Sequence, residues 1–404
     1  MRYARLPIEV ESPEEFGYGN IRNNLAESSI SDRKLSDLGL TVPDLTLLYT
    51  EHRGSTSLRG LIARDGAGLT ADDVLVTTGA AGALFIIATA LLSPGDHIVV
   101  VRPNYGLNLE TPRAIGCDIS YIDLSFDTGF RTDVDQVAAA VTPKTKVISI
   151  THPHNPSGIL SDEAELHRLA RIAADVGAYL VVDETYRELC FGTLTPLAAT
   201  LGSHVISVSS LSKAYGVPGT RMGWLVVKNP ELHEIFLAAK EQIAICGSVV
   251  DEWIAEQLLS RKDEILAETL AEMGQRRARV IEWMADEDML EWNEPSGGVV
   301  GFVRMRGEPA GGVAAFYERL LNDHGTYVAP GHWFDLPDTY FRLGYGWPTR
   351  DEMEAGLVAI SAALRGKHSA GQKRAADPVR NRRPPFCAPQ STSLSHTALA
   401  IAMS

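Results

Sequence analysis

The chain of 404 residues has few cysteines and no long apolar run. Its four cysteines, at positions 117, 190, 246 and 387, are far apart and form no Cys-x-x-Cys pair, which excludes a zinc cluster and a disulfide framework. The longest apolar stretch, 83–92, is about half the length of a membrane span. The N-terminal residues carry charges where a signal peptide is apolar. We therefore expect a soluble cytoplasmic protein with reduced thiols, no metal and no membrane partner.

Basic residues are also scarce, because 37 Lys and Arg stand against 51 Asp and Glu, a net charge of −14. An acidic chain lacks the positive face that binds phosphate backbones, so nucleic acid is not expected as a partner. The hydrophobic share of 45% and the charged share of 22% are typical of a folded protein and exclude collagen and wholesale disorder. The length is enough for about two domains.

Residues 70 to 230 alternate short apolar runs with helical patterns. Seven runs rich in Val and Ile predict strands at 74–77, 97–101, 119–122, 146–150, 179–182, 205–208 and 223–227. Helical patterns lie between them, for example at 82–92 and 162–176. This alternation predicts an α/β fold with a mostly parallel sheet sandwiched by helices. Ligands of such sheets bind at the carboxyl ends of the strands, so the residues that follow each strand are the candidates for function.

The rest of the chain predicts a second, smaller α/β domain. A long helical region runs from 230 to about 289, and further strand and helix patterns follow, with a helix at 312–321 and a last one that ends near Leu364. We predict a large domain at 46–285, a small C-terminal domain at 286–366 and an N-terminal segment, 1–45, that packs on the small domain. Residues 367–404 hold six basic residues and one acidic residue among Pro, Ser, Thr and Ala, which predicts a disordered basic tail.

The most specific local pattern is a lysine in a turn directly after a predicted strand, within Ser209-Ser210-Leu211-Ser212-Lys213. Arg221 follows eight residues later. A lysine amine has an ordinary pKa of about 10.4 and becomes a nucleophile only when it is desolvated or lies near positive charge. The end of a strand can provide such a pocket, whereas a surface loop would leave Lys213 solvated.

Other candidate residues also follow predicted strands. Asp183 closes the strand 179–182, where its carboxylate faces the ligand crevice and needs a cationic partner. Tyr186 supplies a hydroxyl three residues later, and Asn155 follows the strand 146–150. Small residues at 78–82, Ala80 and Ala81 among them, follow the first strand and open a helix, whose N-terminus can bind a phosphate.

Together, the order and spacing of Asn155, Asp183, Tyr186, Lys213 and Arg221 resemble those of fold-type I pyridoxal phosphate enzymes of the class I/II aminotransferase family. The resemblance runs from about residue 24 to residue 364. It implies a large domain that binds pyridoxal 5'-phosphate and a transaminase that moves an amino group between an L-amino acid and a 2-oxo acid, in amino acid metabolism or specialised biosynthesis.

The resemblance also implies a role for each matching residue. Lys213 would bind the cofactor covalently and move a proton between the substrate Cα and the cofactor. Asp183 would pair with the pyridinium nitrogen, so that the ring can accept electrons. The others would hold the ring or its phosphate: Asn155 and Tyr186 at the phenolic oxygen, Tyr105 stacked on the ring, and Ser210, Arg221 and the backbone of Ala80 and Ala81 at the phosphate.

Two further matches concern the substrate and a second subunit. Arg342 resembles the family's carboxylate-binding arginine, a role that suits a planar guanidinium because it binds a carboxylate bidentately. Tyr49 resembles the tyrosine that reaches the phosphate of a neighbouring subunit. The resemblance therefore implies a homodimer with its active sites at the interface.

The chain departs from the family where the N-terminal region covers the substrate. Glu27 and Ser28 stand where a glycine-containing stretch is usual, and Glu27 could pair with an amine- or guanidinium-bearing substrate or simply face solvent. His332 and Trp333 lie in the loop before Arg342 and could shape the pocket or merely pack. The histidines at 152 and 154, beside Asn155, could assist proton transfer or be structural.

Two alternatives stay open at this stage. The first is another reaction on the same cofactor, such as elimination, cyclisation, decarboxylating deamination or oxidase-like chemistry, because these reactions share the cofactor residues. The second is a non-catalytic regulator with an aminotransferase-like domain, which the retained Lys213 and the absence of a basic helix-turn-helix pattern disfavour.

Overall fold

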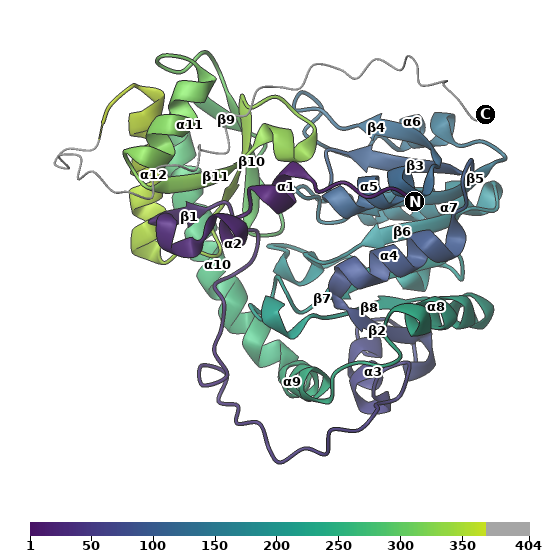
Figure 1. Cartoon of the computed structure of the whole chain (residues 1–404). Helices are drawn as coiled ribbons and strands as arrows, with labels where there is room; N and C mark the ends of the chain where they lie inside the picture. The colour runs from purple at the N-terminus through teal and green to yellow at the C-terminus, as the bar shows by residue number, and fades with distance from the viewer. Residues whose placement is uncertain (369–404) are drawn as a thin grey trace, which may run out of the picture.

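The computed structural model describes residues 1–368, in which two β-sheets are joined by the long helix α10 (Lys262–Asp286) (Figure 1). The larger sheet has the strand order β2-β8-β7-β6-β5-β3-β4. Its strands are β2 (Val74–Thr78), β3 (His97–Arg102), β4 (Asp118–Asp123), β5 (Thr145–Thr151), β6 (Tyr179–Asp183), β7 (Val205–Ser210) and β8 (Met222–Val226). Each lies within two residues of a predicted strand. All neighbours pair in parallel except β8, which is antiparallel to β2 and to β7.

Helices cover both faces of this sheet, which confirms the predicted mixed α/β class. They are α3 (Thr56–Ala63), α4 (Gly79–Leu91), α5 (Gly106–Ile115), α6 (Val134–Ala140), α7 (Glu163–Asp175), α8 (Pro230–Ile243) and α9 (Val249–Ser260). Successive strand residues point to opposite faces of the sheet, so a continuous apolar run gives both faces apolar side chains that helices cover. Val147 and Val181 pack with α4 and α8, whereas Ile148 and Leu180 pack with α6 and α7.

The smaller sheet has the order β1-β11-β12-β10-β9 and joins residues near the N-terminus to residues 290–344. Its strands are β1 (Asn23–Leu25), β9 (Leu290–Trp292), β10 (Val300–Met305), β11 (Thr326–Pro330) and β12 (Tyr340–Gly344), with the helices α11 (Val313–Asn322) and α12 (Arg350–Leu364) beside them. The strand β1 pairs in parallel with β11, from Asn23 opposite Thr326 to Leu25 opposite Val328. The N-terminal region therefore completes a sheet built from the C-terminal third.

Residues 1–20, which we call the N-terminal arm, run from the small domain, where α2 lies near β1, to the large domain, where the N-terminus lies near α5 (Figure 1). The arm holds two single-turn helices, α1 (Pro7–Val10) and α2 (Pro13–Phe16). It contacts the large domain too, since the Arg2 backbone N–H donates to the Ala114 carbonyl at 3.3 Å. We predicted that the N-terminal segment packs on the small domain, and that prediction did not include this contact with the large domain. We retain the predicted domain boundaries, 46–285 and 286–366, as a proposal.

The long helix α10 is bound to both domains. Near its start, the Lys262 Nζ donates to Glu188 Oε1 at 3.2 Å and to the Asp65 carboxylate, both in the large domain. Fourteen residues further along, the Arg276 guanidinium donates to the Tyr345 carbonyl at 3.2 Å in the small domain. The helix therefore ties one domain to the other.

The helical region predicted from 230 to about 289 is confirmed and consists of three separate helices, α8, α9 and α10. Gly247 lies in the connection between α8 and α9 and leaves room for the Glu252 side chain, since a Cβ there would lie 2.2 Å from Glu252 Oε1. Ser248 then caps α9 by accepting from the Asp251 N–H. Apart from residues 367 and 368, the predicted tail lies outside the described residues. Across residues 1–368, every helix is too short or too polar to cross a membrane.

Candidate active site

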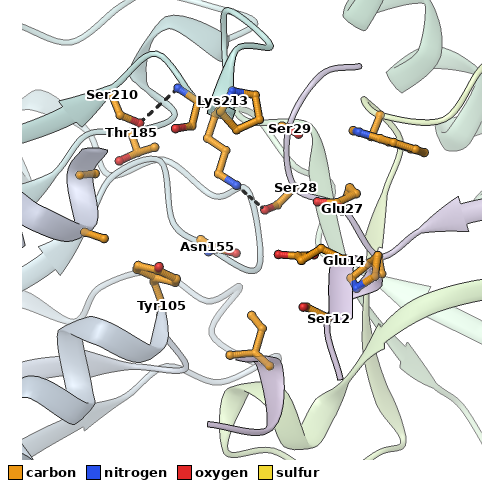
Figure 2. Close-up of a pocket in the computed structure, with 18 of the residues that line it drawn as sticks. Ser12, Glu14, Glu27, Ser28, Ser29, Tyr105, Asn155, Thr185, Ser210 and Lys213 are labelled. Carbon is orange, nitrogen blue, oxygen red and sulfur yellow. Dashed lines mark hydrogen bonds between the residues drawn. The ribbon is translucent and has the colours of Figure 1, made fainter. Parts of the chain in front are cut away.

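A cavity of about 370 Å³ lies where the N-terminal region, the large domain and the small domain meet (Figure 2). The last residues of β5, β6 and β7 line it, so it sits at the carboxyl ends of the parallel strands, as expected for such sheets. It brings together eleven of the twelve predicted site residues: Glu27, Ala80, Ala81, Tyr105, Asn155, Asp183, Tyr186, Ser210, Lys213, Arg221 and Arg342. Tyr49 does not line it.

Lys213 lies in the turn after β7, where its Nζ donates to Ser28 Oγ at 3.0 Å (Figure 2). Backbone hydrogen bonds hold the two segments together, since the Ile30 N–H donates to the Lys213 carbonyl at 3.2 Å. Gly216 permits this approach, because it has a φ of +64° and a Cβ there would lie 2.4 Å from the Ser31 carbonyl oxygen. The Ser28 hydroxyl is thereby fixed beside the amine.

Asp183 is buried at the end of β6. Burial raises the pKa of its carboxyl, although the Thr185 hydroxyl, which donates at 2.5 Å, and the Lys213 amine favour the charged form. A buried carboxylate of this kind is stabilised best by a cationic hydrogen-bond donor. A protonated pyridine nitrogen is such a donor.

The opposite end of the cavity is built to bind an anion. Ala80 and Ala81 lie in the first turn of α4, whose free N–H groups and helix dipole attract negative charge. Gly79 has a φ of +68°, and a Cβ there would lie 2.7 Å from Arg221 Nη2. Gly223 brings β8 equally close, because its Cβ would lie 2.3 Å from the Gly79 carbonyl carbon. The two glycines therefore let a guanidinium and a helix N-terminus face the same space.

Arg342 is buried at the small-domain side of the cavity. Its Nη1 donates to Asn155 Oδ1 at 3.0 Å and its Nη2 to the Ala26 carbonyl at 2.8 Å. Within residues 1–368, its Nε and the Tyr186 hydroxyl are buried without a hydrogen-bond partner. Buried polar atoms of this kind are normally paired, so a ligand carboxylate and a ring oxygen would fit these two positions.

Four acidic side chains line the wall that the N-terminal region supplies: Glu9, Glu14, Glu27 and Asp32. Glu14 and Glu27 lie across the cavity from Tyr105 and Thr185 (Figure 2). The Tyr18 hydroxyl donates to Glu27 Oε1 at 3.1 Å. Burial raises the pKa of the Glu27 carboxyl, and the nearby Lys213 amine opposes that rise. Four carboxylates from the N-terminal region therefore share the cavity with the cations Lys213 and Arg342, and Glu27 lies near both of them.

The histidines near the site take structural positions. His154 is buried, with Nδ1 2.7 Å from Ser157 Oγ and Nε2 donating to the Pro103 carbonyl at 2.8 Å. Burial lowers the pKa of both His152 and His154 to about 4, so both are neutral at pH 7. Neither lines the cavity, which favours the structural alternative over proton transfer. In the loop before Arg342, Trp333 lines the cavity and His332 does not.

Several lining residues were not predicted from the sequence, above all those of the N-terminal arm: Ile8, Glu9, Ser12, Pro13, Glu14 and Tyr18. The arm follows no strand of the large sheet, so the strand-end rule could not identify it. The Ser-Pro-Glu-Glu run at 12–15 was a detectable helix start, although it gave no sign of where the helix would lie. Within residues 1–368, no group of three or more His, Cys, Asp or Glu side chains could hold a metal ion.

The family model for aminotransferase class I and II matches residues 44–360. The chain belongs to this family. It is a transaminase-family enzyme whose cofactor is pyridoxal phosphate, and its buried Asp183, its unpaired Tyr186 hydroxyl and its anion-binding end fit that cofactor.

Relatives of the enzyme carry out more than one reaction. It is 33% identical over 327 residues to capreomycidine synthase of Streptomyces vinaceus, covering 80% of this chain and 82% of the relative. It is 33% identical over 301 residues to the arginine–pyruvate transaminase AruH of Pseudomonas aeruginosa, covering 71% and 74%. The structure matches a PLP-dependent aminotransferase from Streptococcus suis with a TM-score of 0.84 at 27% identity, covering 92% and 100%. It also matches the PLP-dependent cyclase OrfR with a TM-score of 0.81 at 29% identity, covering 91% and 98%.

Replacing Gly79 with alanine should weaken the binding of pyridoxal phosphate. The new Cβ would meet Arg221 and displace its guanidinium from the anion-binding space, so we expect the cofactor dissociation constant to rise roughly tenfold, the loss of one charge-assisted hydrogen bond. Cofactor titration followed by absorbance measures it. Gly82→Ala is the matched control on the same helix, because its Cβ would have no atom closer than 3.5 Å. Equal dissociation constants for the two variants would contradict the anion-site geometry.

Proposed function

We propose that the enzyme transfers the amino group of an L-amino acid with a cationic side chain to a 2-oxo acid. The four carboxylates that the N-terminal region brings into the cavity carry this proposal. Arg342 and Lys213 would meet the α-carboxylate and the reacting carbon, and the acidic wall would face the substrate side chain. The relatives agree with it, because one of them is named as a transaminase of arginine.

The residues assigned to the cofactor would each bind a different part of it. Asp183 would keep the pyridine nitrogen protonated, Tyr105 would stack on the ring, and the remaining contacts would come from Asn155, Tyr186, Ser210, Arg221 and the backbone of Ala80 and Ala81. When bound, pyridoxal phosphate supplies an electron sink that stabilises negative charge developing at the substrate Cα. Lys213 Nζ would carry the proton to and from that carbon.

Ser28 and Arg342 would complete the part of the site where the substrate Cα reacts. Ser28 Oγ, 3.0 Å from Lys213 Nζ, would orient the amine toward the substrate. Arg342, whose Nε has no partner within the described residues, would bind the α-carboxylate and so fix the orientation of the Cα–H bond. Arg342 is buried, and the low local dielectric strengthens its charged contacts.

Lys213→Ala should abolish transamination. Removing the proton carrier should lower the rate by at least roughly 10²- to 10⁴-fold. The measurement is chromatographic detection of the amino acid formed from each 2-oxo acid, together with borohydride reduction, which should fix the cofactor to the native chain and not to the variant. A variant that retains the native rate would contradict the assignment. A native enzyme with a lysine-bound cofactor that releases ammonia or carbon dioxide, and exchanges no amino group, would show a lyase instead.

Glu27→Gln should reduce the preference for a cationic substrate. We expect kcat/KM for arginine to fall roughly tenfold or more, the loss of one charge-assisted hydrogen bond, while kcat/KM for neutral amino acids stays near the native value. Glu15→Gln is the matched control, because Glu15 lies on the same segment and outside the cavity. Equal losses on arginine and on neutral amino acids would contradict a cationic subsite at Glu27.

A second candidate reaction is a lyase or cyclase reaction on a similar amino acid. Two of the similar proteins are named as a capreomycidine synthase and a PLP-dependent cyclase, so this fold supports such chemistry in relatives. The Ser28 hydroxyl beside Lys213 favours it too, because a hydroxyl there could hydrogen-bond a leaving group on the substrate Cβ. Product analysis of the native enzyme separates the two candidates.

We also propose a cytoplasmic homodimer. The segment before α3 leaves three consecutive apolar residues exposed, Leu47 at 80%, Leu48 at 60% and Tyr49 at 77%, and the exposed Ile243 ends α8. This segment runs along the outside of the molecule (Figure 1). Exposed apolar patches of this kind usually bind a partner, and a two-fold interface would place Tyr49 near a second copy. The free thiols of Cys117, Cys190 and Cys246 fit a reducing compartment.

Tyr49→Phe should weaken cofactor binding in the dimer and leave the dimer intact. Loss of one hydrogen bond to a phosphate should raise the cofactor dissociation constant roughly tenfold. Sedimentation gives the oligomeric state, and absorbance titration gives the dissociation constant. Tyr179→Phe is the control, because Tyr179 begins β6 at the end opposite Asp183. A monomeric native enzyme, or an unchanged dissociation constant, would contradict the role proposed for Tyr49.

A further inference from the structure

One carboxylate of the N-terminal arm is bound to the loop before β12. Glu11 lies between the two single-turn helices of the arm. Its Oε2 accepts from His332 Nε2 at 2.8 Å and from Trp333 Nε1 at 2.8 Å, both in the 3₁₀ turn Gly331–Phe334. Its backbone carbonyl accepts from the Tyr327 hydroxyl at 2.8 Å. Three contacts therefore tie one residue of the arm to the small domain.

His332 lies between two carboxylates, one from each side. Its Nε2 faces Glu11 from the arm, and its Nδ1 lies 2.8 Å from Asp338 Oδ1 in the loop that leads to β12. The His332 backbone N–H also donates to Asp338 Oδ1, at 2.9 Å. Both ring nitrogens must donate to satisfy two carboxylates, so the geometry requires the protonated imidazolium.

The electrostatics agree with this geometry. Burial lowers the pKa of His332, but the hydrogen bonds and charges of Asp338 and Glu11 outweigh burial and raise the pKa to about 9. The imidazolium therefore persists at neutral pH. Its stabilising effect is complete below the ordinary histidine pKa of about 6.5 and is lost as the pH rises through about 9.

The arm needs such an anchor because it has little structure of its own. Each of its two α-helices is a single turn of four residues, which is unstable without tertiary contacts. Residues on both sides of Glu11 nevertheless line the cavity, Ile8 and Glu9 before it and Ser12 to Glu14 after it. Glu11 and His332 do not line the cavity themselves.

We propose that Glu11 and His332 are positioning residues, a charged latch that holds the N-terminal arm in place as the substrate-binding wall of the cavity. The latch sets the affinity for the substrate side chain and leaves the chemistry at Lys213 unchanged. This inference rests on the proposed function in one respect, namely that the substrate side chain lies against the arm.

The first test follows the arm itself and requires no substrate. Amide hydrogen exchange of residues 7–20 in the holoenzyme should speed up roughly tenfold in His332→Gln and in Glu11→Gln, while exchange in β6 and β7 stays unchanged. In the native enzyme the same amides, corrected for intrinsic exchange, should lose protection between about pH 8 and pH 10. His332→Arg should retain protection across that range, because its guanidinium stays charged.

The matched control is His167→Gln, which removes an exposed histidine 3.7 Å from Glu163 on α7. It should leave exchange in the arm unchanged. The latch is overturned if arm exchange is equal in the native enzyme and in both latch variants, whether or not protection of the native arm depends on pH. If His332→Gln does not fold, Glu11→Gln and the native pH series give the same decision.

The second test separates binding from chemistry. For a cationic amino acid, Glu11→Gln should raise KM roughly tenfold and change kcat less than about twofold, with the cofactor absorbance unchanged. A fall in kcat with an unchanged KM overturns the positioning role. If exchange in the arm responds as expected but no cationic amino acid is a substrate, the latch holds and the proposed function fails, so the two failures are distinguishable.

Discussion

The parallel pairing of β1 with β11 is the constraint on which the site depends. It joins Asn23 to Thr326 across most of the chain, and the Asn23 side chain also donates to Thr326 Oγ1 at 2.9 Å. Once β1 is fixed, the next residues must cross the end of β12, where Gly344 leaves room because a Cβ there would lie 1.9 Å from the Glu27 carbonyl oxygen. That crossing delivers Glu27 and Ser28 to the cavity.

Because of this constraint, the large domain and the N-terminal region contribute different parts of the site. The strand ends of the large domain hold the groups that face the cofactor, and these groups are fixed by a sheet covered on both faces. The N-terminal region supplies the acidic wall, which is held by hydrogen bonds and by the partly buried ion pair of Glu11 with His332. Specificity can therefore change in the N-terminal region without disturbing the cofactor site, which is consistent with relatives that carry different names.

Much of the fold and of the site could be predicted from the sequence, for physical reasons that apply to some residues and not to others. Asp183, Ser210 and Lys213 follow buried parallel strands, and the carboxyl ends of such strands always meet at one edge. Glu14 and His332 obey no such rule, because their positions depend on contacts between segments about 320 residues apart, such as that of Glu11 with His332. Tyr49 is predictable only from the family resemblance, since one chain leaves it exposed.

The long helix α10 couples the positions of the two domains. Its 25 residues extend about 37 Å. At the large-domain end Lys262 forms ion pairs with Asp65 and Glu188, and further along the helix Arg276 donates a hydrogen bond to the small domain. A rotation of about 3° about the Lys262 end would move the far end of the helix by about 2 Å. A small adjustment of the ion pairs at Lys262 would therefore shift the small domain by a distance that is large compared with the tolerance of a hydrogen bond.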